Sequence, residues 1–358
     1  MRKLVISFIT ALFFLLNNSG YSQGKGVWSF ENANKWYLQH KWIVGCNFIP
    51  STAENTLEMW QNDTFDPVTI DRELALAQSI GFNSVRVFLH YLVWQQDPAG
   101  FIKRLNKFLD IASKHKITTM FVLFDDCWNG YPKLGKQPAP IPGVHNSRWV
   151  QCPGQREVTY KPLFPVFKKY VTDIISSFRG DKRIIMWDLY NEPGGSKHRT
   201  ETLPLLKNVF RWAREANPTQ PLTAGIWNVT SDYSALNNFQ LENSDIITFH
   251  NYKDVKNMKL MIDSLKKYHR PLVCTEYMCR PTSTFEKILP LLRKERIGAY
   301  NWGFVSGKTQ TIYPWDSWKK MYPEEPRIWF HDIFRQNGTP YDIKETELIK
   351  KLTSVNKK

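Results

Sequence analysis

Short apolar segments alternate with longer amphipathic segments along most of the chain. The short segments are rich in Val, Ile, Phe and Trp, and the longer ones repeat their apolar residues at helical spacing. This alternation is typical of strand-helix units and of a parallel sheet. Eight segments are predicted to be strands, at residues 42–49, 84–90, 117–125, 184–191, 221–228, 245–252, 271–278 and 298–305.

The helix expected after the first strand has recognisable ends. Asp66 is a typical N-cap, Pro67 suits the first helical position, and Gly81 ends the segment. With 358 residues, of which 42% are hydrophobic, the chain could form one barrel-sized domain or two ordinary ones. Because no linker rich in Gly or Ser divides it, we predict a single (β/α)8 TIM barrel.

Two long connections are expected at the catalytic face of such a barrel. Residues 128–165 follow the third predicted strand and residues 306–326 follow the eighth, and both are rich in Pro, Gly and aromatic residues. They could leave a groove open at both ends or close one end into a pocket.

The first residues resemble an export signal. Arg2 and Lys3 precede an apolar run from Leu4 to Leu16, and small residues surround a plausible cleavage site between Ser22 and Gln23. The run is too short for a comfortable transmembrane helix. We therefore predict a signal peptide at 1–22, a catalytic domain at 23–358, and an exported protein, either periplasmic or extracellular.

The five cysteines do not indicate a disulfide framework. Their number is odd, so at least one is unpaired, although Cys127 and Cys152 flank a loop that they could bridge. No CxxC or His pair has metal-ligand spacing, so we expect no structural zinc and no metal or other cofactor.

The formal charge of +15 could favour acidic polysaccharides or nucleic acid. The lysines are instead scattered over helix-like segments, which favours solvated helix faces, and no basic-aromatic nucleic-acid signature is present. We expect a glycan substrate, no nucleic-acid partner, no transmembrane segment and a monomer.

Polar residues lie where the strands of a barrel would end, which is where TIM barrels carry their active sites. The fourth strand ends in Asn191-Glu192-Pro193 and the seventh in Glu276-Tyr277. Two carboxyl groups facing each other suit glycoside cleavage, because one can protonate the glycosidic oxygen while the other serves as nucleophile or activates water.

The segments "WDLYNEP" and "CTEY" resemble the acid/base and nucleophile motifs of clan A glycoside hydrolases. The whole set most resembles glycoside hydrolase family 5, the cellulase and mannanase family, over roughly residues 40–336. The resemblance implies that Glu192 is the general acid/base, that Asn191 contacts the sugar 2-hydroxyl, and that Glu276 is the nucleophile, held by Arg86.

Further matches follow the sixth and eighth predicted strands. The resemblance implies that His250 neighbours the acid/base, that the hydroxyl of Tyr252 contacts the nucleophile, and that Trp302 is the aromatic platform beneath the cleaved sugar. Together these residues imply a retaining, double-displacement glycosidase that acts on β-linked glycans.

The chain departs from the family near the end of the third strand. A histidine is usual there, whereas this chain has "FDDCWNG", and His90 may not be equivalent. We expect Asp126 and Trp128 of this segment, and Trp315 of the last long loop, to contact substrate. Other residues that could do so are Trp94, Trp227, Trp318, Lys308 and Gln310.

Two other functions remain open at this point. A retaining transglycosylase would share every catalytic residue, and sequence alone does not separate it from a hydrolase. A non-catalytic carbohydrate-binding barrel would keep the aromatic residues but lose one carboxylate, whereas Glu192 and Glu276 are both present.

Overall fold

The computed structural model of the protein describes residues 26–354, and the predicted signal peptide lies outside them. Its eight strands form one parallel sheet in the order β5-β4-β3-β2-β1-β8-β7-β6. A parallel bridge between Ile226 and Phe249 joins the segment after β5 to β6 and closes the ring. The strands are β1 (Val44–Asn47), β2 (Ser84–Phe88), β3 (Thr118–Val122), β4 (Ile184–Asp188), β5 (Leu222–Thr223), β6 (Ile247–His250), β7 (Leu272–Tyr277) and β8 (Gly298–Asn301).

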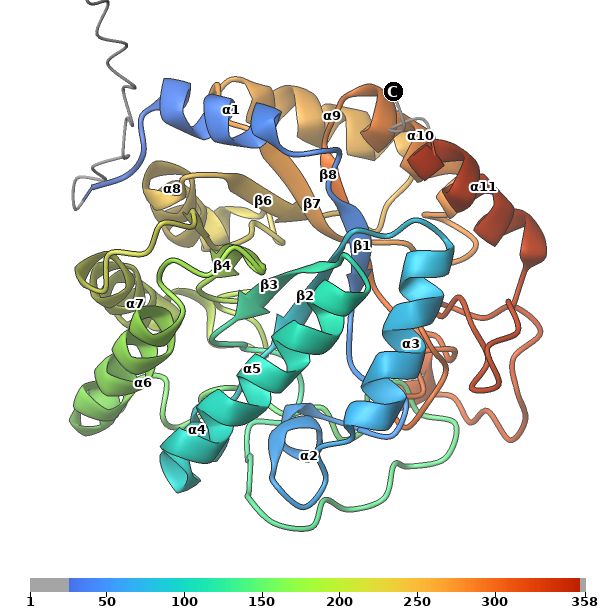
Figure 1. Ribbon diagram of the computed structural model, residues 1–358, viewed down its shortest axis with the longest axis horizontal. Helices are drawn as coiled ribbons and strands as arrows, with labels where there is room; N and C mark the ends of the chain where they lie inside the picture. Colours follow the sequence, from blue (N-terminus) through green and yellow to red (C-terminus); the bar gives the residue numbers. More distant parts are fainter. Residues whose placement is uncertain (1–25, 355–358) are drawn as a thin grey trace, which may run out of the picture.

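The α-helices cover the outside of this ring, as Figure 1 shows. They are α1 (Phe30–Gln39), α2 (Thr56–Trp60), α3 (Pro67–Ser79), α4 (Tyr91–Gln96), α5 (Pro98–Lys114), α6 (Phe164–Ser177), α7 (Leu203–Glu215), α8 (Ser234–Asn243), α9 (Val255–Lys266), α10 (Phe285–Lys294) and α11 (Ile343–Ser354). The fold is the predicted single (β/α)8 barrel, and each predicted strand segment contains an observed strand. Most of the core lies between the sheet and these helices.

The predicted ends of α3 are confirmed. The side chain of Asp66 accepts a hydrogen bond from the backbone N–H of Thr69, Pro67 occupies the first turn, and Ile70, Leu74 and Ala77 are buried. A cap of this kind satisfies one of the N–H groups that a helix start leaves unpaired.

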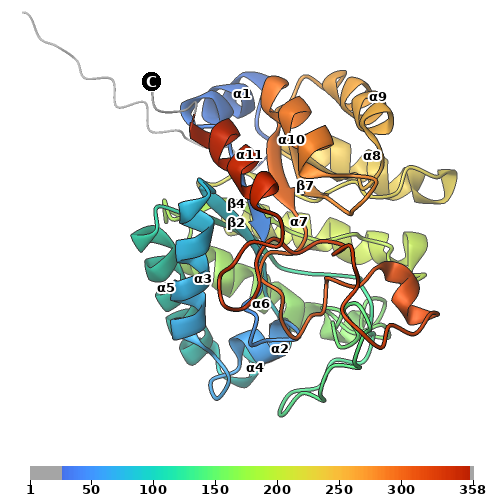
Figure 2. The same cartoon turned by 90° about the vertical axis from the view of Figure 1, so that its right-hand side faces the viewer.

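Helix α1 closes the amino end of the barrel. Ala33 and Tyr37 on this helix are buried in a cluster with residues of the barrel interior, among them Met120 and Val273. Figures 1 and 2 show α1 at the end opposite the long loops after β3 and β8, which lie side by side. The carboxyl end of the barrel is therefore the end that remains available for a functional site.

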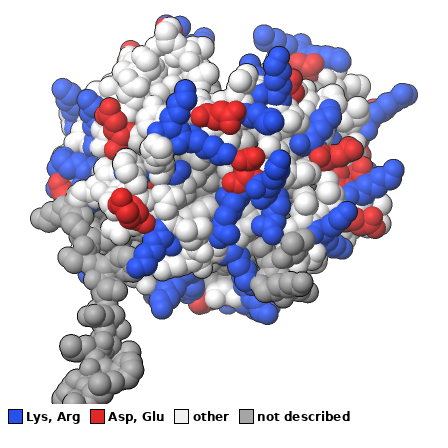
Figure 3. Space-filling model, turned by 90° about the horizontal axis from the view of Figure 1, so that it is seen from above, with Lys and Arg blue, Asp and Glu red and all other residues white. Residues whose placement is uncertain are grey.

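Charged side chains are spread over the surface at the α1 end. Figure 3 shows Lys and Arg dispersed over this face with Asp and Glu among them. Among the ion pairs of the described residues are those between Lys266 and Glu295 and between Lys169 and Asp173. Among residues 26–354, no helix is long and apolar enough to span a membrane.

The possible bridge between Cys127 and Cys152 is not formed, and all five cysteines are free. The Cys152 thiol points to the backbone, donating to the carbonyl oxygen of Leu123 at 3.5 Å. The Cys127 thiol points instead toward the carboxyl end of β4, where it meets the side chain of Glu192.

Candidate active site

A cleft of about 950 Å³ lies at the carboxyl end of the barrel, and both candidate carboxylates, Glu192 and Glu276, line it. The loops that follow β3 to β8 supply its lining, as expected for a TIM barrel. Besides those two residues, the expected site residues that line it are Asn191, His250, Tyr252, Trp302, Trp128 and Trp315.

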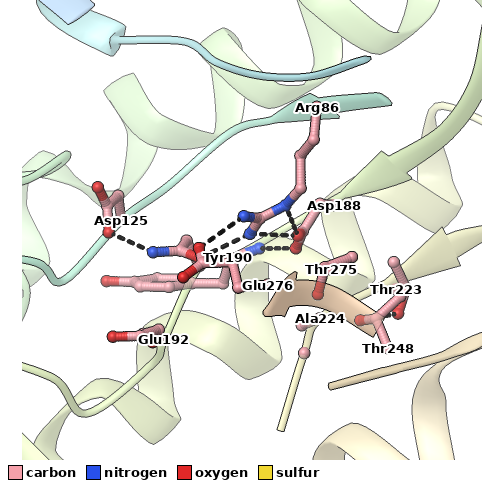
Figure 4. Close-up of polar contacts among 12 residues, drawn as sticks. Arg86, Asp125, Asp188, Tyr190, Glu192, Thr223, Ala224, Thr248, Thr275 and Glu276 are labelled. Atoms are coloured by element: carbon pink, nitrogen blue, oxygen red, sulfur yellow. Dashed lines mark hydrogen bonds and ion pairs between the residues drawn. The ribbon is translucent and has the colours of Figure 1, made fainter. Parts of the chain in front are cut away.

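A buried arginine lies beneath the cleft. Arg86 on β2 is fully buried, and its Nε and Nη2 donate to Asp188 Oδ2 at 2.9 and 2.8 Å. Its Nη1 donates to Asn47 Oδ1 at 2.7 Å and to Glu276 Oε1 at 2.9 Å. Figure 4 shows the guanidinium reaching across the barrel interior to these carboxylates. Arg86 therefore holds Glu276 from below and is not itself part of the cleft surface.

Glu276 at the end of β7 has donors on both oxygens. Oε1 accepts from Arg86, and Oε2 accepts from the hydroxyl of Tyr252 at 2.7 Å. Burial and the neighbouring Glu192 carboxylate raise the pKa of Glu276, whereas His250, Arg86 and the hydrogen bond from Tyr252 oppose that rise. Because both oxygens are fixed by donors, this carboxylate is suited to remain ionised.

Glu192 has a different environment. Its φ is +43°, in the left-handed region that non-glycine residues rarely adopt, so the chain turns sharply where β4 presents this side chain. Oε2 accepts from the Cys127 thiol at 3.1 Å, and 19% of the side chain is exposed. Burial raises its pKa, while the thiol hydrogen bond and the more distant charge of Arg86 lower it.

His250 lies between the two carboxyl groups. Its Nδ1 is 2.8 Å from Glu192 Oε1 and 3.5 Å from Glu276 Oε2, so an N–H at this position can donate to either. Burial lowers the pKa of His250 to about 4, which keeps the imidazole neutral near pH 7. The ring therefore links the carboxyl groups without adding a charge.

One oxygen of Glu192, one oxygen of Glu276 and one ring nitrogen of His250 all lie within 4.8 Å of one another. In retaining glycosidases the carboxyl groups are about 5 to 5.5 Å apart, and in inverting ones about 6.5 to 9.5 Å apart. The short distance between the two oxygens is compatible with the smaller of these separations. Among the described residues these three side chains also form the one cluster with donors close enough to hold a metal ion.

The amide of Asn191 is fixed from two sides. Arg86 Nη2 donates to its Oδ1 at 2.6 Å, and its Nδ2 donates to Asp125 Oδ1 at 2.8 Å. Asp125 also accepts from the indole of Trp149 at 2.7 Å. These contacts determine which end of the amide is oxygen and which is nitrogen, because Arg86 can only donate.

Aromatic rings line the cleft around the carboxylates. The Trp302 ring meets those of Phe88 and Trp149 edge to face, at centroid distances of 5.8 and 5.5 Å. Trp128 stacks on Trp318 at 5.3 Å, and Trp315 packs against Tyr252 at 5.1 Å. Trp227 also lines the cleft.

Asp126 does not reach the cleft, contrary to expectation. It is fully buried and accepts from the Tyr190 hydroxyl at 2.7 Å, the Gly194 N–H at 2.8 Å and the Thr202 hydroxyl at 2.6 Å. These contacts fasten the loop that follows Glu192. Asp126 is therefore a structural residue of that loop.

Four other residues considered from the sequence also lie outside the cleft. Trp94 packs against Tyr170 in the core, and His90 is buried against the carbonyl oxygen of Gln151. Lys308 pairs with Glu58, and Gln310 bonds the backbone of residues 141–144. These residues shape the fold or the loops around the cleft.

Three contributors were not recognised from the sequence. Asn47 and Asp188 lie on strands β1 and β4, where their side chains reach Arg86 in the barrel interior. From the sequence, Cys127 is only a possible disulfide partner. The position of Asn47 and Asp188 near strand ends was the available signal, whereas nothing in the sequence pairs Cys127 with Glu192.

Residues 44–306 match the family described as Cellulase (glycosyl hydrolase family 5). The match covers most of the chain, so the protein belongs to glycosyl hydrolase family 5 and is a glycosidase. A comparison with curated protein sequences found no significant match.

Solved structures share the fold at low sequence identity. A GH5_18 protein from Streptomyces cattleya, solved in complex with GlcNAc, is 11% identical with a TM-score of 0.61, over 88% of this chain and 80% of that one. An exo-beta-1,4-mannosidase from Opitutaceae bacterium strain TAV5 is 16% identical with a TM-score of 0.59, over 87% and 59%. An endo-1,4-beta-D-mannanase from Thermotoga petrophila RKU-1 is 15% identical with a TM-score of 0.56, over 87% and 99%.

The buried position of Arg86 leads to a stability prediction. In Arg86→Met, Asp188 and Glu276 lose their cation, and we expect a loss of about 3–5 kcal/mol in the free energy of unfolding at pH 7. The loss should shrink at lower pH, where protonation removes the unpaired negative charges. Urea unfolding at several pH values measures both effects.

Arg211→Met is the matched control, because Arg211 forms an exposed ion pair with Glu215. It should cost no more than about 0.5 kcal/mol. Equal losses in the two variants would contradict the assignment of Arg86 as the central buried charge.

Proposed function

We propose that this protein is a retaining glycoside hydrolase that cleaves β-linked glycans by double displacement, with Glu192 as acid/base and Glu276 as nucleophile. The observation that carries the proposal is the pair of cleft carboxyl groups with oxygens within 4.8 Å of each other. That separation leaves room for direct attack on the anomeric carbon but not for an intervening water.

In the first step, a Glu276 oxygen attacks the anomeric carbon while Glu192 donates its proton to the glycosidic oxygen. The leaving sugar departs as an alcohol, and the remaining sugar becomes an ester of Glu276. The raised pKa of Glu192 favours the protonated form that this step requires. Arg86 and Tyr252 hold the attacking carboxylate in place.

In the second step, Glu192 takes a proton from a water that attacks the same carbon and releases Glu276. The charge of Glu276 has been consumed in the ester, so an ionised Glu192 no longer faces a neighbouring negative charge and can act as a base. The Cys127 thiol and a His250 N–H can both donate to the ionised Glu192.

Asn191 and Trp302 would position the sugar that is transferred. Asn191, fixed by Arg86 and Asp125, can offer its amide to a ring hydroxyl, and Trp302 offers an indole surface for the C–H face of the ring. Because several similar structures are mannanases or a mannosidase, β-linked manno-oligosaccharides are the first substrates to test.

A retaining transglycosylase would use the same residues and differ only in the acceptor. Product analysis with and without added acceptor sugar separates the two activities. We also propose, from the sequence of residues 1–22, that the protein is exported and matures near Gln23, and that it acts as a monomer.

Replacement of the nucleophile tests the proposal most directly. Glu276→Ala should abolish cleavage of aryl β-glycosides, and azide should restore turnover by attacking from the vacated side. The product should be the glycosyl azide of inverted configuration, which proton NMR identifies. Glu242→Ala, at an exposed glutamate, is the control and should keep full activity. Full activity in Glu276→Ala would remove Glu276 from the mechanism.

Replacement of the acid should depend on the leaving group. Glu192→Ala should slow substrates with poor leaving groups, such as unactivated disaccharides, far more than nitrophenyl glycosides, because nitrophenolate leaves without a proton. The measurement is kcat/KM for both substrate types in the variant and the unmodified protein. Equal losses for both would argue against an acid role.

The contact between Cys127 and Glu192 predicts a change in the pH profile. The thiol stabilises the ionised carboxylate, so Cys127→Ala should raise the pKa of Glu192. Since the acid must be protonated, the alkaline limb of kcat/KM should move to higher pH. Cys46→Ala removes a buried thiol elsewhere and should leave the limb unchanged. A limb that stays in place in both variants would show that the thiol does not tune Glu192.

A further inference from the structure

One side of the cleft is a wall made by residues 141–149 from the loop after β3 and residues 307–318 from the loop after β8. Two side chains of the second segment join it to the first. Gln310 donates to the carbonyl oxygen of Ile141 at 2.7 Å and accepts from the Gly143 N–H at 2.9 Å. The hydroxyl of Ser317 accepts from the His145 N–H at 3.0 Å. Figure 2 shows the two loops side by side.

Further contacts make the wall continuous. The Asn146 N–H donates to the Thr309 carbonyl oxygen at 2.8 Å, and His145 Nδ1 lies 2.8 Å from the Tyr313 carbonyl oxygen. The wall is also tied to the loop after β1, since Asn55 donates to the Arg148 carbonyl oxygen at 3.0 Å. The wall thus passes in front of β1 and β2, which lie between β8 and β3 in the sheet.

The space that the described residues enclose behind this wall is small. Trp149 and Trp302 separate the cleft from a cavity of about 20 Å³, which Phe88 also lines. That volume is close to the minimum that one water requires. No described residue from 44 to 117 lines the cleft, so the loops after β1 and β2 do not extend it.

The opposite side of the cleft is open. Trp227 and Val229 after β5, and Lys253 after β6, line it there, and the Val229 side chain is 71% exposed. The cleft therefore runs from the wall, past the two carboxyl groups, to the surface above β5 and β6.

The position of Glu192 determines the orientation of a bound glycan in this cleft, which is open on one side and closed on the other. The indole of Trp227 donates to the Pro193 carbonyl oxygen at 3.1 Å, so the open side adjoins the segment that carries Glu192. The backbone N–H of Trp302 donates to the carbonyl oxygen of Tyr277 at 3.0 Å. Tyr277 follows Glu276 directly, so the closed side adjoins Glu276. The acid protonates the leaving sugar, so that sugar lies on the open side, and the sugar bonded to the nucleophile lies against the wall.

We infer that the enzyme releases single sugars from the non-reducing ends of β-linked chains, because the wall leaves room for one sugar on the nucleophile side of the cleaved bond. This inference rests on the proposed retaining glycosidase function. The bond changes are those of the two steps above, with water as the acceptor and the terminal monosaccharide as the product.

The test uses β-1,4-linked manno- and cello-pentaoses that carry a fluorophore at the reducing end. Early digests should contain the monosaccharide and the labelled tetrasaccharide, in at least about tenfold molar excess over any shorter labelled product. A benzylidene acetal across O4 and O6 of the non-reducing sugar should abolish cleavage. Labelled di- or trisaccharides at early times, release of a disaccharide, or cleavage of the blocked chain would overturn the inference.

A loosened wall should change the products. In the double variant Gln310→Ala/Ser317→Ala, shorter labelled products should appear from the unblocked pentaose, and the blocked chain should become a substrate. Gln95→Ala/Ser176→Ala changes the same residue types on exposed helix positions and should keep the original product pattern. An unchanged pattern in the wall variant, with its fold intact by circular dichroism, would count against the wall as the cause.

The glycosidase function and the release of terminal sugars can be contradicted by different results. If the unmodified protein cleaves internal bonds, and Glu276→Ala abolishes that cleavage, the glycosidase function stands and the terminal-sugar inference is wrong. If it cleaves neither oligosaccharides nor aryl β-glycosides, the proposed function itself is wrong.

Discussion

The buried charge of Arg86 is the constraint on which the site depends. A guanidinium inside a barrel is tolerated only when carboxylates and other acceptors surround it, and here Asn47, Asp188, Asn191 and Glu276 do so from three different strand ends. The same contacts position the amide and the carboxylate that face the cleft. Stability of the barrel interior and geometry of the site are therefore linked, and a change at Arg86 affects both.

The same charge explains why two neighbouring carboxyl groups can differ. The two negative charges of Asp188 and Glu276 already exceed the single positive charge of Arg86. Ionisation of Glu192 would therefore add a further buried negative charge a few ångströms away. Glu276 has the arginine and tyrosine donors, whereas Glu192 has a thiol and a neutral histidine. The donors on both oxygens of Glu276 favour its ionised form, and because the two carboxyl groups are close neighbours they titrate as a unit.

Hydrophobic periodicity predicted the barrel because each strand is an apolar run that a helix pattern follows. It overestimated strand lengths: residues 221–228 contain only the two-residue β5, since the chain leaves the hydrogen-bonded ladder to reach the cleft. Helix α1 was missed because only Ala33 and Tyr37 on it are buried.

The motifs predicted Glu192 and Glu276, but adjacent residues of an irregular segment point in different directions. Asp125 therefore supports Asn191 while Asp126 holds the next loop, which sequence alone did not distinguish.

The wall beside Trp302 affects which concentration of substrate determines the rate. If only chain termini fit the cleft, the effective substrate concentration is the number of termini and not the mass of polymer. A long glycan would then be a dilute substrate even when abundant, and any process that cuts it internally would raise the turnover of this enzyme without touching the protein. A hydrogen-bonded pair of loops would in that way make the rate depend on the length distribution of the glycan.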